Sequence, residues 1–313
     1  MHRSIRCRLG LIGLCLVALT GAAAPLAAQP SAESEVLVTP GWLAGRLSDP
    51  KIRTIDLGKT ATQFAAGHIP GAQFVDWRVD IVDSSEPGQF LVAPAAAVEA
   101  LLSRLGIHAD STIVLYDSQS SRIAARMFWV LRYYGHRDVR ILDGGSNAWE
   151  AADGHLESGL TSVAATDYRI TESKPSLRVD RAWVRSALGQ PDIAIVDARA
   201  EEFYSGESIG TPFRGDQPNA RAGHIPGAKN FFWADHFNPD GTFKSAAELR
   251  SAYEALGIIP TDTVISYCHV GLQASTPWFV LSELLGFADV RLYDASMAEW
   301  ANMTDTELVL GKD

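Results

Sequence analysis

The second half of this 313-residue chain repeats the first half, and this repetition limits the possible folds more than any other feature. The six residues 67–72, Gly-His-Ile-Pro-Gly-Ala, recur unchanged at 223–228. From Leu105 onward, matching residues lie 151 positions apart without a gap: Tyr116, Phe128, Gly135, Asp143 and Trp149 correspond to Tyr267, Phe279, Gly286, Asp294 and Trp300. One register kept over about forty residues indicates two homologous domains.

The repeat also sets the expected domain boundaries. We expect one domain at residues 36–156, a polar linker at 157–174 and a second domain at 175–306. Residues 1–28 differ, with three arginines, an uncharged apolar run at 9–19 and small residues that end in Leu-Ala-Ala. This pattern predicts a cleaved signal peptide, because the apolar run is shorter than the roughly 20 residues that span a bilayer. We therefore expect an exported, periplasmic protein that has no membrane attachment after cleavage.

Each copy alternates short β-branched runs with helix-length segments. Six segments have the length and composition of buried strands: residues 52–55, 113–116, 139–142, 193–196, 264–267 and 290–293. Four segments have apolar residues at helical spacing: residues 95–105, 124–134, 246–256 and 274–285. This alternation predicts an α/β fold in which each domain has a mainly parallel sheet flanked by helices.

The composition excludes some classes of partner. Without residues 1–28 the chain has 24 Lys and Arg against 37 Asp and Glu. Such an acidic surplus does not favour nucleic acid or an anionic membrane as a partner. About 285 residues, rich in apolar side chains, are enough for two globular domains, and we expect them to remain a monomer.

Cys268 is the single cysteine beyond the predicted signal peptide, which contains Cys7 and Cys15. An intramolecular disulfide is therefore impossible in the cleaved chain. A lone cysteine is more often an inert core residue than a nucleophile. Cys268, however, directly follows a predicted strand and precedes a predicted helix, and ligands of parallel sheets bind beyond the carboxyl ends of the strands.

The segment after Cys268 has the features of an anion-binding loop. Residues 269–273 are a short connection, and Gly271 can take backbone angles that other residues resist. We expect the loop N–H groups and the N-terminus of the next helix to point at the thiol. This arrangement would lower the thiol pKa and stabilise the nucleophilic thiolate, so the sequence predicts a reactive cysteine.

The sequence resembles the tandem-domain rhodanese family, the thiosulfate and 3-mercaptopyruvate sulfurtransferases. Three features carry the resemblance: the paired hexapeptides, the Tyr-Cys-x-x-Gly loop at 267–271, and the aspartate and tryptophan that close each repeat at Trp149 and Trp300. It covers essentially all of residues 36–303. The resemblance implies two rhodanese-like domains, of which the second is catalytic. The first, with Asp117 in place of the cysteine, would be silent and form one wall of the cleft.

The resemblance also implies a reaction. Cys268 would take sulfur from a small anionic donor, hold it as a persulfide and pass it to a thiophilic acceptor such as cyanide, a thiol or a protein cysteine. The loop would bind the substrate and stabilise the developing charge. Its residues are His269, Val270, Gly271, Leu272 and Gln273. No organic cofactor is implied, and the chain lacks the Cys and His spacing of a zinc site.

Several arginines have two interpretations. Arg199 matches the family arginine that binds the anionic group of the donor, but it could instead form a structural ion pair with Asp197. Arg214 and Arg221 lie in a segment unique to the second copy. They could add positive charge to the cleft, although a solvated loop is the favoured interpretation.

The two hexapeptide histidines are also open to structural roles. His224 is interpreted as structural, because the silent copy has the same residue. His68 stays open, since mercaptopyruvate enzymes assign a relay role to a matching histidine.

The loop sequence differs from both main subtypes of the family. Thiosulfate enzymes typically have basic residues directly after the cysteine, and mercaptopyruvate enzymes have a serine at the position of Val270. His269 could carry partial positive charge and help to bind an anion. Because the relay serine is absent, thiosulfate is the favoured donor and 3-mercaptopyruvate is the alternative.

Two other classes of function compete with a sulfurtransferase. A phosphatase of the related type needs an arginine six residues after the cysteine to clamp phosphate, and Ala274 occupies that position. A non-catalytic rhodanese module that carries sulfur or binds a protein partner would have the same loop, so the sequence leaves it open.

Overall fold

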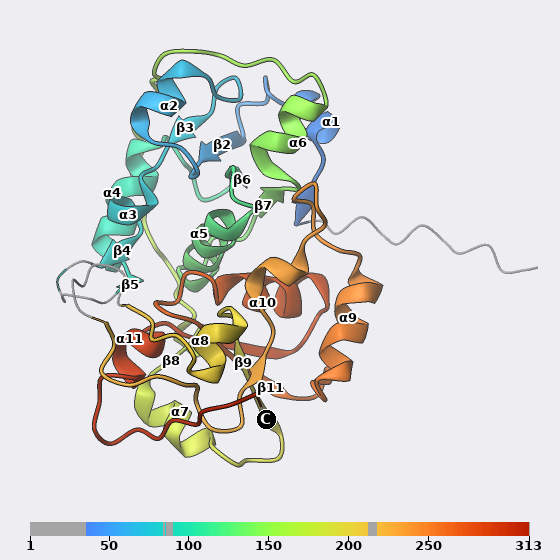
Figure 1. The fold of residues 1–313 in the computed structure, drawn as a ribbon. Helices are drawn as coiled ribbons and strands as arrows, with labels where there is room; N and C mark the ends of the chain where they lie inside the picture. The colour runs from blue at the N-terminus through green and yellow to red at the C-terminus, as the bar shows by residue number, and fades with distance from the viewer. Residues whose placement is uncertain (1–35, 84, 86–89, 212–217, 313) are drawn as a thin grey trace, which may run out of the picture. The chain divides into compact units, whose positions relative to one another are not determined.

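The structure, a computed structural model, describes residues 36–83, 85, 90–211 and 218–312 (Figure 1). The predicted signal peptide at residues 1–28 and Arg214 lie outside the described residues. Within them, no helix combines the length and the apolar character that crossing a membrane requires.

The first copy contains seven short strands and six helices in its described residues. The strands are β1 (Leu37–Val38), β2 (Ile52–Asp56), β3 (Gln73–Phe74), β4 (Val82–Asp83), β5 (Leu91–Val92), β6 (Thr112–Tyr116) and β7 (Val139–Leu142). The helices are α1 (Pro40–Ala44), α2 (Ala61–Ala66), α3 (Trp77–Asp80), α4 (Ala95–Arg104), α5 (Arg122–Tyr133) and α6 (Gly145–Ala151).

The second copy repeats this order of elements. The strands are β8 (Arg178–Val179), β9 (Ile193–Asp197), β10 (Lys229–Asn230), β11 (Thr263–Tyr267) and β12 (Asp289–Tyr293). The α-helices are α7 (Arg181–Ala187), α8 (Glu201–Ser205), α9 (Ala246–Ala255), α10 (Ser275–Phe279) and α11 (Ser296–Trp300). Short 3-10 turns lie at η1 (Pro175–Leu177) and η2 (Trp233–His236), and η3 (Val280–Leu284) is a π-helical turn.

Both copies build a five-stranded sheet with the same strand order. The order is β1-β7-β6-β2-β3 in the first and β8-β12-β11-β9-β10 in the second, and every pairing within them is parallel. A separate antiparallel pair joins β4 and β5. The predicted duplication and the predicted α/β class are therefore confirmed.

The predicted strands are all present, each within one residue of its expected ends. Three of the predicted helices form α4, α5 and α9, and the capping box of Ser245 and Glu248 fixes where α9 begins. The helix predicted at 274–285 is instead divided into α10 and η3. The N–H of Leu285 bonds to the carbonyl of Val280, five residues earlier, at 2.9 Å, so the helix widens at its end.

The predicted linker, residues 157–174, contains one isolated bridge between Glu157 and His68 and otherwise no helix or strand.

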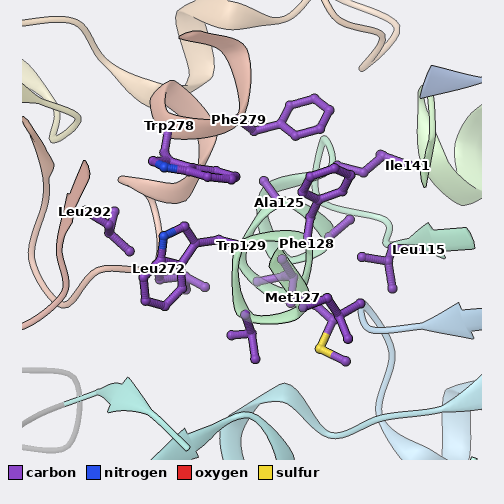
Figure 2. Packing of buried hydrophobic residues seen from close by; sticks show 14 of the residues in the cluster. Leu115, Ala125, Met127, Phe128, Trp129, Ile141, Leu272, Trp278, Phe279 and Leu292 are labelled. Atoms are coloured by element: carbon purple, nitrogen blue, oxygen red, sulfur yellow. The ribbon is translucent and has the colours of Figure 1, made fainter. Parts of the chain in front are cut away.

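The two copies share one hydrophobic core. Helices α5 and α10 lie between the two sheets (Figure 1). At their contact, Phe128 and Phe279 occupy the same position in the two repeats and meet edge to face, with ring centroids 4.8 Å apart (Figure 2). The surrounding cluster combines residues of both copies: Leu115, Met127, Ile141, Leu272, Trp278 and Leu292. The copies are thus related by an approximate two-fold axis, and the interface between them is part of the core.

The outer face of each sheet has a smaller core of its own. In the first copy, Leu43 of α1, Phe64 of α2 and Trp149 of α6 pack together there. In the second copy, Tyr204 of α8 and Trp300 of α11 do the same. Each sheet is therefore covered on both faces, which leaves the carboxyl ends of the strands as the place for a site.

Candidate active site

Cys268 lies at the carboxyl end of β11, the central strand of the second sheet, and its side chain is fully buried. Four backbone N–H groups donate to its sulfur, from the loop residues Val270, Gly271 and Gln273 and from Ala274 at the start of α10. Gly271 has a φ of 79°, a left-handed conformation that turns the loop back over the sulfur. The loop thus has the inward-pointing amides that the sequence predicts.

The first copy has the same loop with a carboxyl group in the place of the thiol, and burial raises the pKa of this carboxyl group while the loop amides oppose the shift. Asp117 directly follows β6 as Cys268 directly follows β11. Its two carboxylate oxygens accept the N–H groups of Gln119, Ser121, Ile123 and Ala124, at 2.6, 3.0, 2.8 and 2.9 Å respectively. A loop of this form therefore offers backbone donors to both oxygens of a buried carboxyl group, which supports the interpretation that its counterpart can stabilise negative charge.

The thiol pKa is shifted in the direction opposite to the prediction. Burial raises the pKa of Cys268 above its ordinary value of 9.0, and the four amides lower it by less than burial raises it. The prediction included the effect of the loop amides alone. Burial also removes all water from around the sulfur, and this penalises the charged form of the thiol. In the free protein the thiol is consequently protonated at neutral pH.

A cavity of about 590 Å³ opens in front of Cys268. Four of the predicted substrate-binding residues line it: His269, Val270, Leu272 and Gln273. The fifth, Gly271, contributes its N–H to the sulfur instead. The other lining residues come from both copies: Trp77, Arg78, Arg122, Phe203, Ile209 and Thr211. The site is therefore formed by two domains, as the family resemblance implies.

The sequence reasoning missed the two arginines of this cavity, Arg78 and Arg122, because both belong to the silent copy. Arg122 is the first residue of α5, directly after the Asp117 loop, and corresponds in the repeat to Gln273. Its guanidinium lies over the ring of Trp233, 5.0 Å from the centroid. Burial lowers the pKa of Arg122, and the nearby Asp117 opposes this shift. An arginine guanidinium is protonated at neutral pH in proteins, so Arg122 is a cation of the cavity wall.

The predicted partial charge on His269 is wrong. Burial, together with the positive charge of Arg199, lowers the pKa of His269 to about 4. Its ring meets Phe203 edge to face, with centroids 4.7 Å apart. His269 is therefore a neutral, mainly aromatic wall of the cavity.

Arg199 has the contacts of its structural alternative. Its guanidinium bonds to both carboxylate oxygens of Asp197, with Nη2 2.6 Å from Oδ2, and to the carbonyl of Gly223 at 2.9 Å. The side chain is almost completely buried and is not among the described residues that line the cavity. The geometry therefore corrects the binding role that the sequence favoured: Arg199 joins the end of β9 to the hexapeptide turn.

His68 and His224 also make structural contacts. The Nδ1 of His224 bonds to the carbonyl of Tyr204 at 2.8 Å, and the two rings stack. In the first copy, His68 makes the matching contact with Phe64 at 2.9 Å, and its Nε2 lies 3.1 Å from Thr161 Oγ1. Both rings are thus used to hold the turn, and neither lines the cavity.

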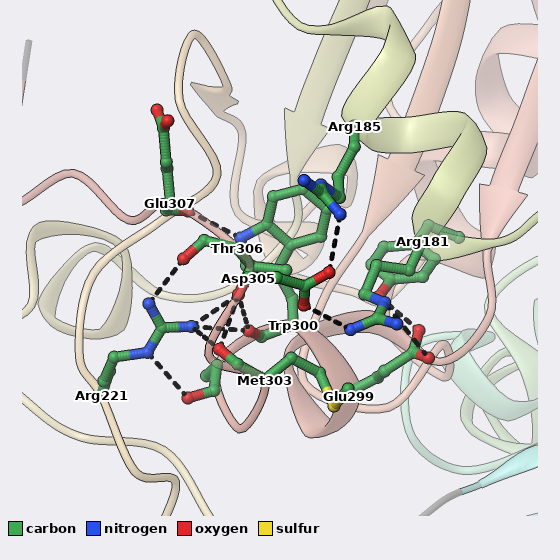
Figure 3. Close-up of polar contacts among 11 residues, drawn as sticks. Arg181, Arg185, Arg221, Glu299, Trp300, Met303, Asp305, Thr306 and Glu307 are labelled. Carbon is green, nitrogen blue, oxygen red and sulfur yellow. Dashed lines mark hydrogen bonds and ion pairs between the residues drawn. The ribbon is translucent and has the colours of Figure 1, made fainter.

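Arg221 lies in neither the cleft nor a solvated loop (Figure 3). Its guanidinium donates to the carbonyl oxygens of Trp300, Ala301 and Thr306, at 3.0, 3.3 and 2.6 Å. These carbonyls follow or end α11, where a cation is favoured by the helix dipole. Arg221 therefore holds the segment after α11 in place through hydrogen bonds. The prediction that Arg221 lies in a solvated loop is wrong.

Comparison with known proteins agrees with this architecture. The rhodanese-like domain family matches the chain twice, at residues 39–152 and 180–303. The sulfur carrier protein TtuD of Thermus thermophilus is 38% identical over 285 residues, which cover 90% of this chain and 99% of that protein. The thiosulfate sulfurtransferase of Corynebacterium glutamicum is 36% identical over 290 residues, covering 90% and 93%. The structure of SseA from Escherichia coli, described as a 3-mercaptopyruvate sulfotransferase, superposes with a TM-score of 0.75 at 27% identity, over 83% of this chain and 98% of SseA.

The chain therefore belongs to the rhodanese family, as a protein with two rhodanese-like domains. Its similarity to several proteins named thiosulfate sulfurtransferase, over most of its length, places it among the sulfurtransferase enzymes. The family predicted from the sequence is confirmed.

Arg199→Ala tests the structural assignment of this arginine. We expect the free energy of unfolding to fall by about 3–5 kcal/mol, because Asp197 would stay buried without its partner. The KM for the sulfur donor should change by less than about twofold in the protein that remains folded. Denaturant unfolding and kinetics measured on one preparation decide the matter. A raised KM at unchanged stability would return Arg199 to the binding site.

Proposed function

We propose that the protein transfers a sulfane sulfur atom from thiosulfate to a thiophilic acceptor through a persulfide on Cys268. The observation that carries this proposal is the position of the sulfur, on the floor of the cavity and under four backbone N–H groups. Two arginines of the first copy, Arg78 and Arg122, line the same cavity. An anionic donor between the arginines and the thiol would meet positive charge at one end and the nucleophile at the other.

In the first step the Cys268 thiol loses its proton to solvent, and the resulting thiolate attacks the outer sulfur of thiosulfate. A sulfur–sulfur bond forms to Cys268, the bond to the sulfonate sulfur breaks, and sulfite leaves with the electron pair. The enzyme then holds a persulfide anion, whose charge the N–H groups of the loop stabilise. In the second step an acceptor such as cyanide attacks the outer sulfur, thiocyanate leaves and the thiolate is restored.

The cavity supports a donor that needs no proton relay. The loop position used by the relay serine of mercaptopyruvate enzymes is Val270, an apolar wall of the cavity. The histidine that would continue such a relay, His68, is occupied by Phe64 and Thr161. Sulfite is a stable leaving group. Mercaptopyruvate instead loses pyruvate as its enolate, and a proton donor assists the departure of that enolate. These observations support thiosulfate as the donor.

Two alternatives share the same loop. 3-Mercaptopyruvate has a carboxylate that Arg122 could bind, and SseA, a relative of known structure, is described as a 3-mercaptopyruvate sulfotransferase. A sulfur carrier would keep the first step and deliver the sulfur to a protein, and a relative is named as one. Rates with small acceptors, compared with transfer to a protein thiol, separate a carrier from a small-molecule enzyme.

Cys268→Ser tests the nucleophile. We expect the substitution to abolish cyanide-dependent formation of thiocyanate, since a serine hydroxyl cannot accept sulfane sulfur. The melting temperature should stay close to that of the wild type, because the hydroxyl can accept the same N–H groups. Residual turnover well above the uncatalysed rate would overturn the assignment.

The choice of donor is tested by two rates. We expect a higher kcat/KM for thiosulfate than for 3-mercaptopyruvate at every pH between about 6 and 9, because the described lining of the cavity has two arginines and has Val270 at the position of the relay serine. Both donors are compared with the same acceptor at the same concentration. A clear preference for mercaptopyruvate would contradict the proposed donor and leave the persulfide step untouched.

Arg122→Ala tests the contribution of the silent copy to donor binding. A lost charge-assisted contact of about 1.5–3 kcal/mol predicts at least a tenfold fall in kcat/KM for thiosulfate. Arg122→Lys should recover part of the activity, since it keeps the charge without the planar fork. Arg185→Ala is the control, because it removes an arginine that pairs with Asp305 and does not line the cavity. Equal kinetics for Arg122→Ala and Arg185→Ala would exclude Arg122 from binding.

A further inference from the structure

A buried ion pair connects the two copies next to the catalytic loop. Arg126 of α5 belongs to the silent copy, and Asp294 directly follows β12 in the catalytic copy. The Nη1 atom of Arg126 lies 2.7 Å from Oδ1 of Asp294, and both side chains are fully buried. The other oxygen of Asp294 accepts the N–H of Val92, again in the silent copy, at 2.8 Å.

The same pair contacts the loop at Gly271. The carbonyl of Gly271 lies 3.5 Å from Arg126 Nη1 and accepts the hydroxyl of Ser275 at 3.0 Å. Gly271 packs so closely on Asp294 that a Cβ atom would lie 2.6 Å from its backbone oxygen and 2.7 Å from Oδ1. The N–H of Gly271 donates to the sulfur of Cys268. One residue therefore joins the ion pair to the thiol, and it is the residue whose φ turns the loop.

At the equivalent position beside the Asp117 loop, the aspartate is present but the arginine is not. Asp143, the counterpart of Asp294, accepts the N–H of Phe243, the counterpart of Val92, at 2.9 Å. The position that corresponds to Arg126 is Pro277, which has no charge to offer. The hydrogen bond from a backbone N–H of the other copy is thus made by both Asp294 and Asp143. The ion pair with an arginine is made by Asp294, beside Cys268, and not by Asp143.

Stability alone is a weak reason for such a pair. Removing two charges from water is costly, and a buried ion pair is often no more stabilising than apolar side chains of similar size. The guanidinium is held in place by the ring of Trp129, 4.8 Å away, and by the carbonyl of Phe90 at 3.3 Å. A rigid charge beside a functional loop is more readily explained by the conformation that it imposes.

We propose that Arg126 is a positioning residue, which acts through Asp294 and Gly271 to hold the Cys268 loop in its anion-binding conformation. The inference rests on the proposed role of Cys268 as the nucleophile. It gives the silent copy a second role at the site. Besides forming one wall of the cavity, the silent copy contributes the group that keeps the N–H donors pointed at the sulfur.

The first test uses Arg126→Lys, which keeps a cation for Asp294 but loses the planar guanidinium, whose Nη1 contacts both Asp294 and Gly271 while its Nη2 is held by the carbonyl of Phe90. Its matched control is Asp143→Asn, which weakens the equivalent contact on the silent side. We expect Arg126→Lys to lower the rate of alkylation of Cys268 by iodoacetamide, followed from about pH 7 to 10, and kcat/KM for thiosulfate by about tenfold each. Asp143→Asn should leave both near the wild-type values. Equal effects of the two variants, or an unchanged rate in Arg126→Lys, would overturn the proposal.

A second variant covers the case in which Arg126→Lys does not fold. The double substitution Arg126→Met with Asp294→Asn removes both charges, so neither is left buried and unpaired. We expect this protein to fold and to show the same loss of alkylation rate, and wild-type reactivity in it would overturn the proposal. Alkylation needs only the thiol. A wild-type protein that takes no sulfur from thiosulfate would therefore refute the proposed function while the variants still test the positioning role.

Discussion

The sulfur of Cys268 is held between two opposed effects, and the rest of the site depends on their balance. Complete burial disfavours the charged form of the thiol, whereas four N–H groups of the loop favour it. Burial is the larger effect in the free protein. The loop is consequently better suited to an anion that arrives or forms during the reaction than to a permanent thiolate. Asp117 illustrates the principle, since an equivalent loop satisfies its carboxylate.

The two copies form the cavity in front of Cys268 together. The first copy contributes Arg78 and Arg122 to the cavity, Arg126 to the back of the catalytic loop, and half of the core around Phe128. Residues of α3 and α5 in the first copy therefore line the same cavity as the loop that follows β11 in the second copy. Asp117 keeps the silent loop folded, and that loop carries Arg122 at its end.

Much of the fold could be predicted because its signals are local or repeated. The register of the repeat, the β-branched strands and the strand–cysteine–glycine sequence led to the sheets and to Cys268. The charge on His269 and the direction of the Cys268 pKa were predicted wrongly, because both depend on burial that only the tertiary structure sets. Arg122 was missed because the cysteine whose cavity it lines is 146 positions further along the chain, on the other copy. Arg199 had two interpretations at the sequence level, and its contacts with Asp197 distinguish them.

The central claim is that Cys268 carries the transferred sulfur. The most direct measurement is the mass of the intact protein, and of its cysteine peptide, after incubation with thiosulfate and then with cyanide. The account predicts that the protein gains the mass of one sulfur atom, located on Cys268, and that cyanide removes it with formation of thiocyanate. An unchanged mass under conditions of turnover, or added sulfur that cyanide does not remove, would contradict it.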